Sequence, residues 1–343
     1  MATRTTRTNK RCIALAAWLS AFSLVLAACG GGSGESDGSA DDESTALTVV
    51  TLSGQLLYFP FQLAVANGAY EKAGLDVEEI IVGSGSDASK LFLGGKVDGT
   101  ATAVSHTFLG STQGRDVKIV QSFTSDAALE VVTRKKANIA AGDWSALKGK
   151  TCGATGPGSD TDLLLRALLD SNGVRPDKDV TIQYTGGAGA AIAGFQQGTL
   201  DCFLAIPGMR AQLLLEDLAV PFFELSKSEM ADNPSAGLSL QGEIVRDRPD
   251  VVRKFVEVTL AQVQSIYDDP EAAKKAAQEI YEGLSPEAIN ADLDFMIESK
   301  AFSLDGLQSE DGFDKKIQLY VDAEVLPSKP KYDDVYVNTF LSN

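Results

Sequence analysis

Residues 82–98 read VGSGSDASKLFLGGKVD, and residues 185–201 read TGGAGAAIAGFQQGTLD. The two stretches align without a gap. Each contains a Gly-rich turn, an apolar helical segment, and a Gly separated by two residues from an Asp. The start of the pattern repeats at the same spacing, because residues 47–55 (LTVVTLSGQ) align with residues 150–158 (KTCGATGPG). The chain of 343 residues therefore carries one pattern twice, which predicts two similar lobes.

Strands and helices alternate in each copy with short connections. This alternation is typical of a parallel sheet, because parallel neighbours need crossover helices. In the first copy we expect strands near residues 47–52, 76–82 and 99–104, with helices near 58–72 and 86–95. In the second copy we expect strands at residues 150–155, 179–185 and 201–206, with helices near 160–172, 188–198 and 208–216. The predicted fold class is α/β, with two doubly wound parallel-sheet lobes.

The connections between the copies predict the domain boundaries. Extended stretches at residues 117–123 and 129–135 lead out of the first lobe, and residues 237–243 lead back towards a helical tail. We therefore assign residues 46–135 and 237–343 to the first lobe with a C-terminal helical cap, and residues 136–236 to an inserted second lobe. Two strands that cross between the lobes would form a two-strand hinge.

The first residues have the features of an export signal. Residues 1–28 begin with basic residues, continue with an apolar run and end in small residues, as secretory signals do. The junction Leu26, Ala27, Ala28, Cys29 resembles the bacterial lipoprotein processing motif, in which the Cys receives the lipid. Residues 29–45 are rich in Gly, Ser and Asp, which predicts a flexible tether. We expect an exported chain that is lipid-anchored at Cys29 to the outer face of the cell membrane; an ordinary signal peptide with a chance Cys is the alternative.

Composition excludes several classes of function. The chain has 30 basic and 47 acidic residues and a formal net charge of −17, which argues against a nucleic-acid partner. With one His and no CxxC or HExxH motif, a metal site, a cofactor or thiol redox chemistry has little support. Cys152 and Cys202 lie at equivalent depths in strands that a doubly wound order places side by side. A disulfide and two buried free thiols both remain open.

Ligands of open parallel sheets bind beyond the carboxyl ends of the strands, where helix N-termini point free amides outward. Two lobes that face each other would share one such cleft. Ser159, Asp160 and Thr161 are suited to capping a helix whose amides favour an oxyanion. Arg210 is the cationic side chain near the second lobe's strand tips, and it suits a carboxylate or sulfonate. The candidate ligand-binding residues are Gln55, Tyr58, Ser84, Ser105, His106, Gly158, Ser159, Asp160, Thr161, Pro207 and Arg210.

Structural roles stay open for two of these residues. His106 is the one His of the chain, and a lone His is often a hydrogen-bonded structural residue. Arg210 could be a solvated residue at a helix start. Asp98 and Asp201 precede their strands on the side away from the cleft, so we interpret both as structural turn residues.

Residues 68–103 and 147–207 resemble the solute-binding proteins of ABC importers for nitrate, sulfonate, taurine and bicarbonate. The thiamine-pyrimidine binders belong to the same superfamily, and the likeness covers roughly residues 47–260. It implies a type 2 periplasmic-binding-protein fold that closes on its ligand and docks on a membrane permease with an ATPase inside the cell. By position, it places ligand contacts at Gln55, Ser84, Ser105, His106, Ser159, Asp160 and Pro207. Many relatives carry an acidic residue where this chain has Ile206, which points to a more anionic or more apolar ligand.

The leading hypothesis is a monomeric, lipid-tethered receptor that binds a small solute and breaks no bond. The solute would be an anion such as a sulfonate or carboxylate, or an aromatic compound. One alternative is an enzyme of the same fold, of the pyrimidine-synthesis or small-acid-lyase type. Another is a lipoprotein sensor with a vestigial cleft.

Overall fold

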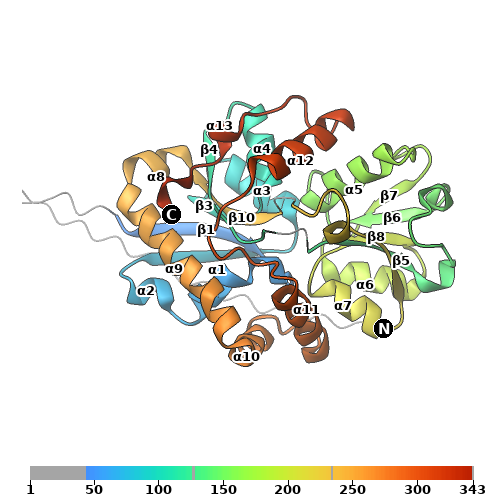
Figure 1. The fold of residues 1–343 in the computed structure, drawn as a ribbon, viewed down its shortest axis with the longest axis horizontal. Coiled ribbons are helices and arrows are strands. Elements are labelled where there is room, and N and C mark those ends of the chain that lie inside the picture. The colour runs from blue at the N-terminus through green and yellow to red at the C-terminus, as the bar shows by residue number, and fades with distance from the viewer. Residues whose placement is uncertain (1–43, 126–127, 233–234, 342–343) are drawn as a thin grey trace, which may run out of the picture. The chain divides into compact units, whose positions relative to one another are not determined.

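The first sheet has the strand order β2-β1-β3-β10-β4 (Figure 1). The structure, a computed structural model, describes residues 44–125, 128–232 and 235–341. β1 pairs in parallel with β2 and β3, as the repeat predicts, whereas β10 runs antiparallel between β3 and β4. The strands are β1 (Ala46–Leu52), β2 (Asp76–Val82), β3 (Gly99–Ala103), β4 (Val117–Ser122) and β10 (Ala236–Gln241).

The second sheet repeats this arrangement with the order β7-β6-β8-β5-β9. β6 pairs in parallel with β7 and β8, and β5 runs antiparallel between β8 and β9. The strands are β5 (Glu130–Arg134), β6 (Thr151–Ala154), β7 (Thr181–Tyr184), β8 (Cys202–Ala205) and β9 (Ala219–Glu224). The predicted α/β fold of two doubly wound lobes is confirmed, and each sheet also contains one antiparallel strand.

The chain crosses between the sheets twice. It leaves the first sheet after β4 and enters the second at β5; it leaves the second after β9 and returns at β10. We expected residues up to 135 in the first lobe, but β5 pairs with β8 and β9, so the first crossing lies between Ser122 and Glu130. The sequence does not show to which sheet β5 belongs, because a short apolar strand can pair with the edge of either sheet.

Helices cover both faces of each sheet, so the central strands β3 and β8 are buried along their whole length. The predicted helix at residues 58–72 is split at Gly68, whose φ of 68° is left-handed. The first lobe contains α1 (Phe59–Ala66), α2 (Ala69–Lys72), α3 (Gly85–Leu93) and α4 (Ser105–Thr112). The second contains α5 (Asp160–Ser171), α6 (Ala188–Gln197) and α7 (Met209–Leu215).

The C-terminal tail packs on both lobes. α9 lies against α1 of the first lobe, whereas α11 lies against α7 and α12 against α5 of the second (Figure 1). The tail contains α8 (Gly242–Asp247), α9 (Pro249–Asp268), α10 (Pro270–Ile280), α11 (Pro286–Glu298), α12 (Glu310–Asp322) and α13 (Tyr332–Val335). The tail is therefore more than a cap on the first lobe. None of the described helices has the length and apolarity needed to cross a bilayer.

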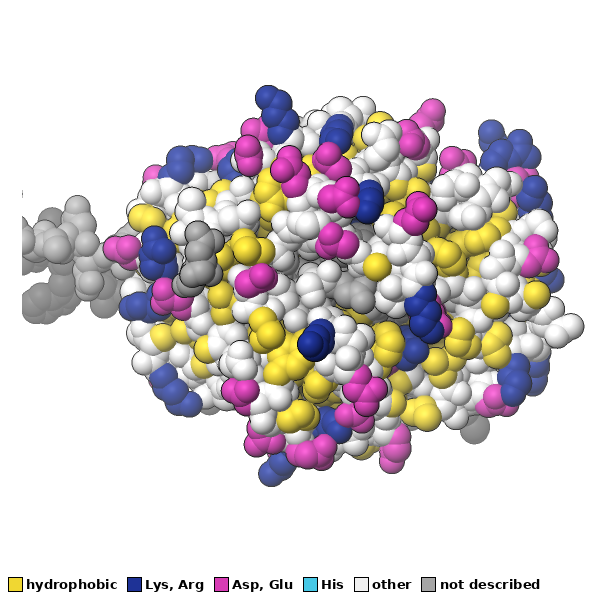
Figure 2. All heavy atoms as spheres, viewed as in Figure 1, with side chains coloured by type: hydrophobic (Ala, Val, Ile, Leu, Met, Phe, Trp, Pro, Cys, Tyr) yellow, Lys and Arg dark blue, Asp and Glu magenta, His cyan; other side chains and the backbone are white. Residues whose placement is uncertain are grey.

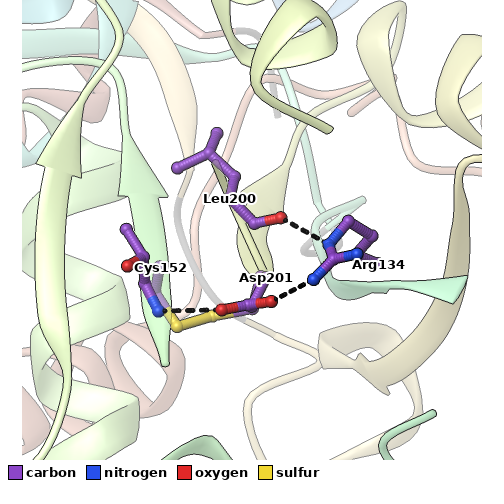
Figure 3. Close-up of a disulfide and its surroundings, with 6 residues drawn as sticks. Arg134, Cys152, Leu200 and Asp201 are labelled. Carbon is purple, nitrogen blue, oxygen red and sulfur yellow. Dashed lines mark hydrogen bonds and ion pairs between the residues drawn. A yellow bond between two sulfur atoms is a disulfide. The ribbon is translucent and has the colours of Figure 1, made fainter. Parts of the chain in front are cut away.

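Cys152 and Cys202 form a disulfide in the second sheet (Figure 3). They are direct register partners on β6 and β8, their Cα atoms lie 4.5 Å apart, and both are fully buried. Beside the disulfide, Asp201 accepts a hydrogen bond from the Thr151 amide (3.2 Å) and pairs with Arg134 (2.7 Å). The disulfide and the structural role of Asp201 follow from the same register.

Candidate ligand-binding site

The strand tips of the two sheets enclose a cavity of about 20 Å³, which we call the central cavity. Side chains from both lobes line it, as expected where carboxyl ends of parallel strands meet. Six of the predicted residues are among them: Gln55, Tyr58, His106, Ser159, Asp160 and Thr161. The rest of the lining is Leu52, Leu57, Gly85, Ala103, Thr155, Ile206 and Ser235.

The start of α5 supplies the polar wall from the second lobe. Ser159 is the N-cap of this helix, and its hydroxyl oxygen accepts hydrogen bonds from the amides of Gly156 and Asp162, both at 3.3 Å. Gly158 has a left-handed φ of 72° and donates its amide to the Asp162 carboxylate (2.8 Å), and it does not line the cavity. Capping of the helix therefore occupies the Ser159 oxygen.

The C-terminal tail contacts the Asp160 carboxylate. Its Oδ1 accepts hydrogen bonds from the Lys316 ammonium (3.3 Å) and the Tyr320 hydroxyl (3.1 Å), both on α12. The Lys316 side chain is completely buried, and this burial lowers the pKa of its amine. A buried ammonium needs a charged partner, so the pair with Asp160 joins the tail to the wall of the cavity.

Sequence reasoning missed Lys316, although a signal was present. The apolar side chains of α12, Phe313, Ile317 and Tyr320, recur at helical spacing and are buried. Lys316 falls within this stripe, three residues after Phe313 and one before Ile317. A charged residue inside an apolar stripe predicts a buried ion pair, although the stripe does not identify the partner.

His106 lies at the start of α4 and is completely buried. Its Nδ1 lies 3.2 Å from the Thr102 hydroxyl oxygen, whereas its Nε2 has no hydrogen-bond partner among the described residues. Burial lowers the pKa of His106 to about 4, so the imidazole is neutral at physiological pH. One ring nitrogen therefore remains available to a molecule in the cavity.

Three other predicted residues lie close by without lining the cavity. Ser84 is the N-cap of α3 and accepts a hydrogen bond from the Asp87 amide (3.2 Å). Ser105 is buried, and its hydroxyl has no partner among the described residues. The Pro207 carbonyl accepts a hydrogen bond from the Leu56 amide (3.2 Å), which joins the two lobes through their backbones.

Arg210 lies outside the lining of the central cavity. Its guanidinium donates to Glu130 (2.7 Å) and to Asp292 (3.1 Å), and it stacks 4.4 Å from the centre of the Phe295 ring. Asp292 and Phe295 come from α11, which packs on α7. The cation that favoured an anionic solute is thus paired with two carboxylates of the chain itself.

Asp292 also caps the N-terminus of α7. Its Oδ2 accepts hydrogen bonds from the amides of Gly208 (2.6 Å) and Ala211 (2.9 Å). Both amides lie at the start of the helix that follows β8, the kind of position at which we expected free amides to face a ligand. A carboxylate of the tail occupies them, and burial raises the pKa of that carboxyl.

A second groove, of about 830 Å³, lies between the Gly-rich loops that follow β2 and β7. Its lining includes the strand-tip residues Ser53, Gly54 and Gly83 from the first lobe, and Gly186 and Gly187 from the second. The end of α10 and the residues after it form the remaining wall. The predicted strand tips are therefore divided between a small enclosed cavity and a larger groove.

The surface carries both signs of charge. On the face shown in Figure 2, Lys and Arg side chains are interspersed with Asp and Glu, without a large basic area. No histidine is visible on this face, in keeping with the burial of His106. This face offers no basic surface for a polyanion.

Two α/β lobes whose strand tips enclose a shared cavity define the periplasmic-binding-protein fold. The chain belongs to the NMT1/THI5-like family, which it matches over residues 58–273. No curated protein matches it. The family match confirms the resemblance to solute-binding proteins.

Solved structures share the whole fold. The alkanesulfonate-binding protein SsuA from Xanthomonas axonopodis, bound to MOPS, is 15% identical with a TM-score of 0.71, over 86% of this chain and 99% of that one. SsuA from Escherichia coli, an aliphatic sulphonate binding protein, is 15% identical with a TM-score of 0.69, over 87% and 94%. The nitrate-binding protein NrtA from Synechocystis is 15% identical with a TM-score of 0.67, over 87% of each chain. At this identity the likeness establishes the fold.

Proposed function

We propose that this chain is the solute receptor of an ABC importer. It binds a small solute in the central cavity and delivers it to a membrane permease, whose ATPase lies inside the cell. The observation that carries the proposal is the lining of one cavity by strand tips of both lobes. A solute bound there contacts both lobes only when they are closed, so binding shifts the population towards the closed state. The sulfonate- and nitrate-binding proteins of the same fold support this assignment.

Solute entry requires the lobes to separate. The central cavity measures about 20 Å³, room for about one water molecule, whereas small-molecule sites usually enclose roughly 300–1,000 Å³. Direct contacts across the cleft include Leu56 N to Pro207 O (3.2 Å) and Ser86 Oγ to Pro157 O (2.7 Å). Each such hydrogen bond is worth about 1 kcal/mol. The buried pair of Lys316 and Asp160 also joins the tail to the second lobe.

A solute screen with a distance readout tests the proposal. We would attach spin labels to Lys72→Cys in the first lobe and Lys178→Cys in the second, both exposed positions. A solute that raises the melting temperature should also shorten the distance between the labels. A control pair at Lys72→Cys and Lys90→Cys, both in the first lobe, should not respond. A broad screen in which no solute stabilises the chain or moves the labels would refute a receptor function.

We propose binding without turnover. Proton-transfer groups are present at the cavity, because His106 and Asp160 line it and Lys316 pairs with Asp160. The same screen therefore includes mass spectrometry of the bound solute after prolonged incubation. An unchanged mass supports a receptor, and a changed mass would assign the chain to the enzymes of this fold.

We propose that the receptor is anchored by lipid at Cys29. This residue, the signal at residues 1–28 and all but the last two residues of the tether lie outside the described residues. The Ala-Ala-Cys junction and the acidic Gly/Ser tether support the proposal. Intact-mass measurement of the membrane-extracted protein should show a diacylglycerol-modified Cys29 at the N-terminus. The Cys29→Ser variant should lose that mass and leave the membrane fraction.

The permease and ATPase are proposed partners of a monomeric receptor. Gentle detergent extraction of the lipidated chain from its native membrane, followed by mass spectrometry, should recover a polytopic permease and an ATPase with it. Light scattering of the chain without its lipid should give the mass of one copy. Recovery of a signalling protein in place of the transporter would favour the sensor alternative.

A further inference from the structure

One face of helix α12, which carries Phe313, Lys316 and Tyr320, contacts both lobes beside the central cavity. On the basis of the proposed receptor function, in which the lobes separate to admit solute, we propose that this face is a clasp. The clasp stays on the first lobe and favours the closed state through Asp160 of the second. Lys316 does not line the cavity, so it is a positioning residue that acts through a carboxylate of the lining.

The clasp is anchored on the first lobe by aromatic rings. Phe313 is completely buried, and its ring meets that of Phe108 on α4 edge to face, with the centroids 5.3 Å apart. The rings of Tyr332 and Tyr336 complete the cluster at 5.5 Å and 5.9 Å from that of Phe313. Tyr336 also forms a parallel bridge with Ile119 of β4. Because aromatic rings bury large apolar areas, this cluster should keep α12 on the first lobe.

The next two turns of the same face reach the second lobe. Lys316 and Tyr320 follow Phe313 by three and seven residues, which is the spacing of one helix face. Both side chains are completely buried. Lys316 Nζ lies 3.3 Å from Asp160 Oδ1, and the Tyr320 hydroxyl lies 3.1 Å from the same oxygen. A single helix face therefore joins the aromatic cluster of the first lobe to the start of α5.

The position of Asp160 shows where the clasp has to release. The loop before α5 lies against the start of α3, because the Ser86 hydroxyl donates to the Pro157 carbonyl oxygen (2.7 Å). The central cavity lies between the starts of α3, α4 and α5, so solute can enter when α5 withdraws from the other two. Because Phe313 anchors α12 on α4, this movement separates Asp160 from Lys316.

The charges make the clasp depend on both partners. The Asp160 side chain is only 13% exposed, and the Lys316 ammonium compensates its charge in the closed state. A buried carboxylate without a cation is strongly unfavourable, whereas water solvates it once the lobes part. Desolvation offsets much of the attraction within a buried ion pair, so the loss of one partner has a larger effect than the pair itself. Removal of Lys316 alone should therefore favour the open state.

The distance between the lobes tests the clasp in the absence of solute. We would use the full mature chain with spin labels at Lys72→Cys and Lys178→Cys, one exposed position on each lobe. The natural background should show a closed fraction beside the open one. Lys316→Met should lower the ratio of closed to open molecules about 10-fold or more, because Asp160 loses its cation.

Further variants separate a clasp from a loss of fold. Lys315→Met is the matched control, because Lys315 precedes Lys316 on α12 and its side chain is half exposed. It should leave the ratio unchanged. The double variant Lys316→Met, Asp160→Asn also removes the stranded carboxylate, so it should regain the closed fraction. The pair Lys72→Cys and Lys90→Cys, within the first lobe, shows in each background whether that lobe is folded.

A label on α12 shows with which lobe the helix moves. Asp311→Cys is an exposed position on this helix. Its distance to Lys90→Cys in the first lobe should stay constant when Lys316→Met opens the lobes. Its distance to Lys178→Cys in the second lobe should lengthen. The reverse pattern would mean that α12 moves with the second lobe, and it would overturn the clasp.

Three other results would also overturn the clasp. They are an unchanged ratio in Lys316→Met, a natural chain without a closed fraction, and a double variant that is as open as the single one. Each leaves the receptor function to the solute screen, because lobes that close on a solute without Lys316 still form a receptor. If the label distance stays the same in every background and with every solute of the screen, both proposals fail.

Discussion

The two lobes have the same sheet topology, strand register and helix arrangement. The segments that follow their third strands differ. In the first lobe, β3 leads into α4, which brings His106 to the central cavity with one nitrogen that pairs with none of the described residues. In the second lobe, β8 leads into α7, where Met209 occupies the position aligned with His106 and is buried. Asp292 of the tail closes the α7 amides. One strand tip therefore remains available to a ligand, and the other is occupied by the protein itself.

The difference shows that a repeated sequence does not imply repeated chemistry. Backbone amides at a helix start bind a carboxylate that the fold places beside them, whether it belongs to a ligand or to the protein. At α7 that carboxylate belongs to α11, which packs on this helix. At α5 the tail contributes a cation, Lys316, to Asp160. The tail thus decides which strand tips of the second lobe remain open to solute.

Removal of Asp292 should have the largest effect. Asp292→Ala leaves the Arg210 guanidinium beside Glu130 alone and two buried amides without partners, so we expect a loss of about 3–5 kcal/mol in the free energy of unfolding. Asp294→Ala on the same helix is the matched control. Asp294 is half exposed and pairs with Lys274, so its loss should cost under about 1 kcal/mol. Equal losses in urea denaturation would contradict the role of Asp292.

Loss of the disulfide should be the next largest effect, and it also separates the lobes. The partners aligned with Cys152 and Cys202 are Val49 and Gly99, which pair in the same register. A Cβ at Gly99 would lie 2.5 Å from Leu240 Cδ2, so the first lobe has no room for a second Cys there.

Reduction should therefore weaken the second lobe only. We expect the double variant Cys152→Ala, Cys202→Ala to lose about 2–4 kcal/mol in the free energy of unfolding, because the disulfide constrains the unfolded chain. A reducing agent should destabilise the natural chain by a similar amount and leave the variant unchanged. Hydrogen exchange should show the loss in β6 and β8 and not in β1 and β3. A uniform loss of protection over both sheets would contradict this assignment.

The third effect is a pH dependence that originates in the first lobe. Burial lowers the pKa of His106 from 6.5 to about 4, while Asp160 opposes and Lys316 adds to the shift. The unfolded chain takes up a proton near pH 6.5, and the folded chain resists it until about pH 4. The stability from the neutral ring is thus complete above pH 6.5 and is lost as the pH falls. Between pH 7 and pH 5 the loss should be about 2 kcal/mol.

The His106→Gln variant isolates this contribution from that of the carboxyl groups. It has no group that titrates in this range, so its free energy of unfolding should fall less between pH 7 and pH 5 than that of the natural chain. The difference between the two slopes measures His106 alone. Parallel slopes would mean that the ring is not buried in the neutral form.

Much of this arrangement could be predicted from the sequence. The repeat at residues 82–98 and 185–201 predicted two similar lobes with parallel strands, and six of eleven candidate residues line the central cavity. These residues follow strands or start helices, where local sequence determines position. The register that joins Cys152 to Cys202 also follows from the repeat, although the sequence left the bond open.

The sequence could not show what the tail does at the strand tips. Arg210 looked available because its partners, Glu130 and Asp292, are far from it in the sequence. Asp292 lies in the buried stripe of Ile289, Leu293 and Met296, as Lys316 does in that of α12. Both positions indicate a buried charge, but pairing depends on which helix packs where.

The smallest expected effect distinguishes the turn carboxylates on the far side of the sheets. Asp98 accepts a hydrogen bond from the Thr48 amide (2.8 Å), and Asp201 accepts one from Thr151 in the aligned place. Asp201 also pairs with Arg134 of β5, the strand of the second sheet that follows the first crossing. Asp98→Ala should cost about 1 kcal/mol in the free energy of unfolding and Asp201→Ala about 2 kcal/mol.

A double-mutant cycle determines whether Arg134 explains the difference. Arg134→Ala should cost about 1 kcal/mol in the natural chain and less in the Asp201→Ala background, because the ion pair is then already broken. The hydrogen bond from Arg134 Nε to the Leu200 carbonyl (3.2 Å) is lost in both backgrounds. Among the described residues of the first lobe, Asp98 accepts the hydrogen bond from Thr48 and pairs with no Arg. If Asp98→Ala and Asp201→Ala cost the same, β5 adds nothing to the stability of the turn, and the lobes differ at their tips and in their disulfide.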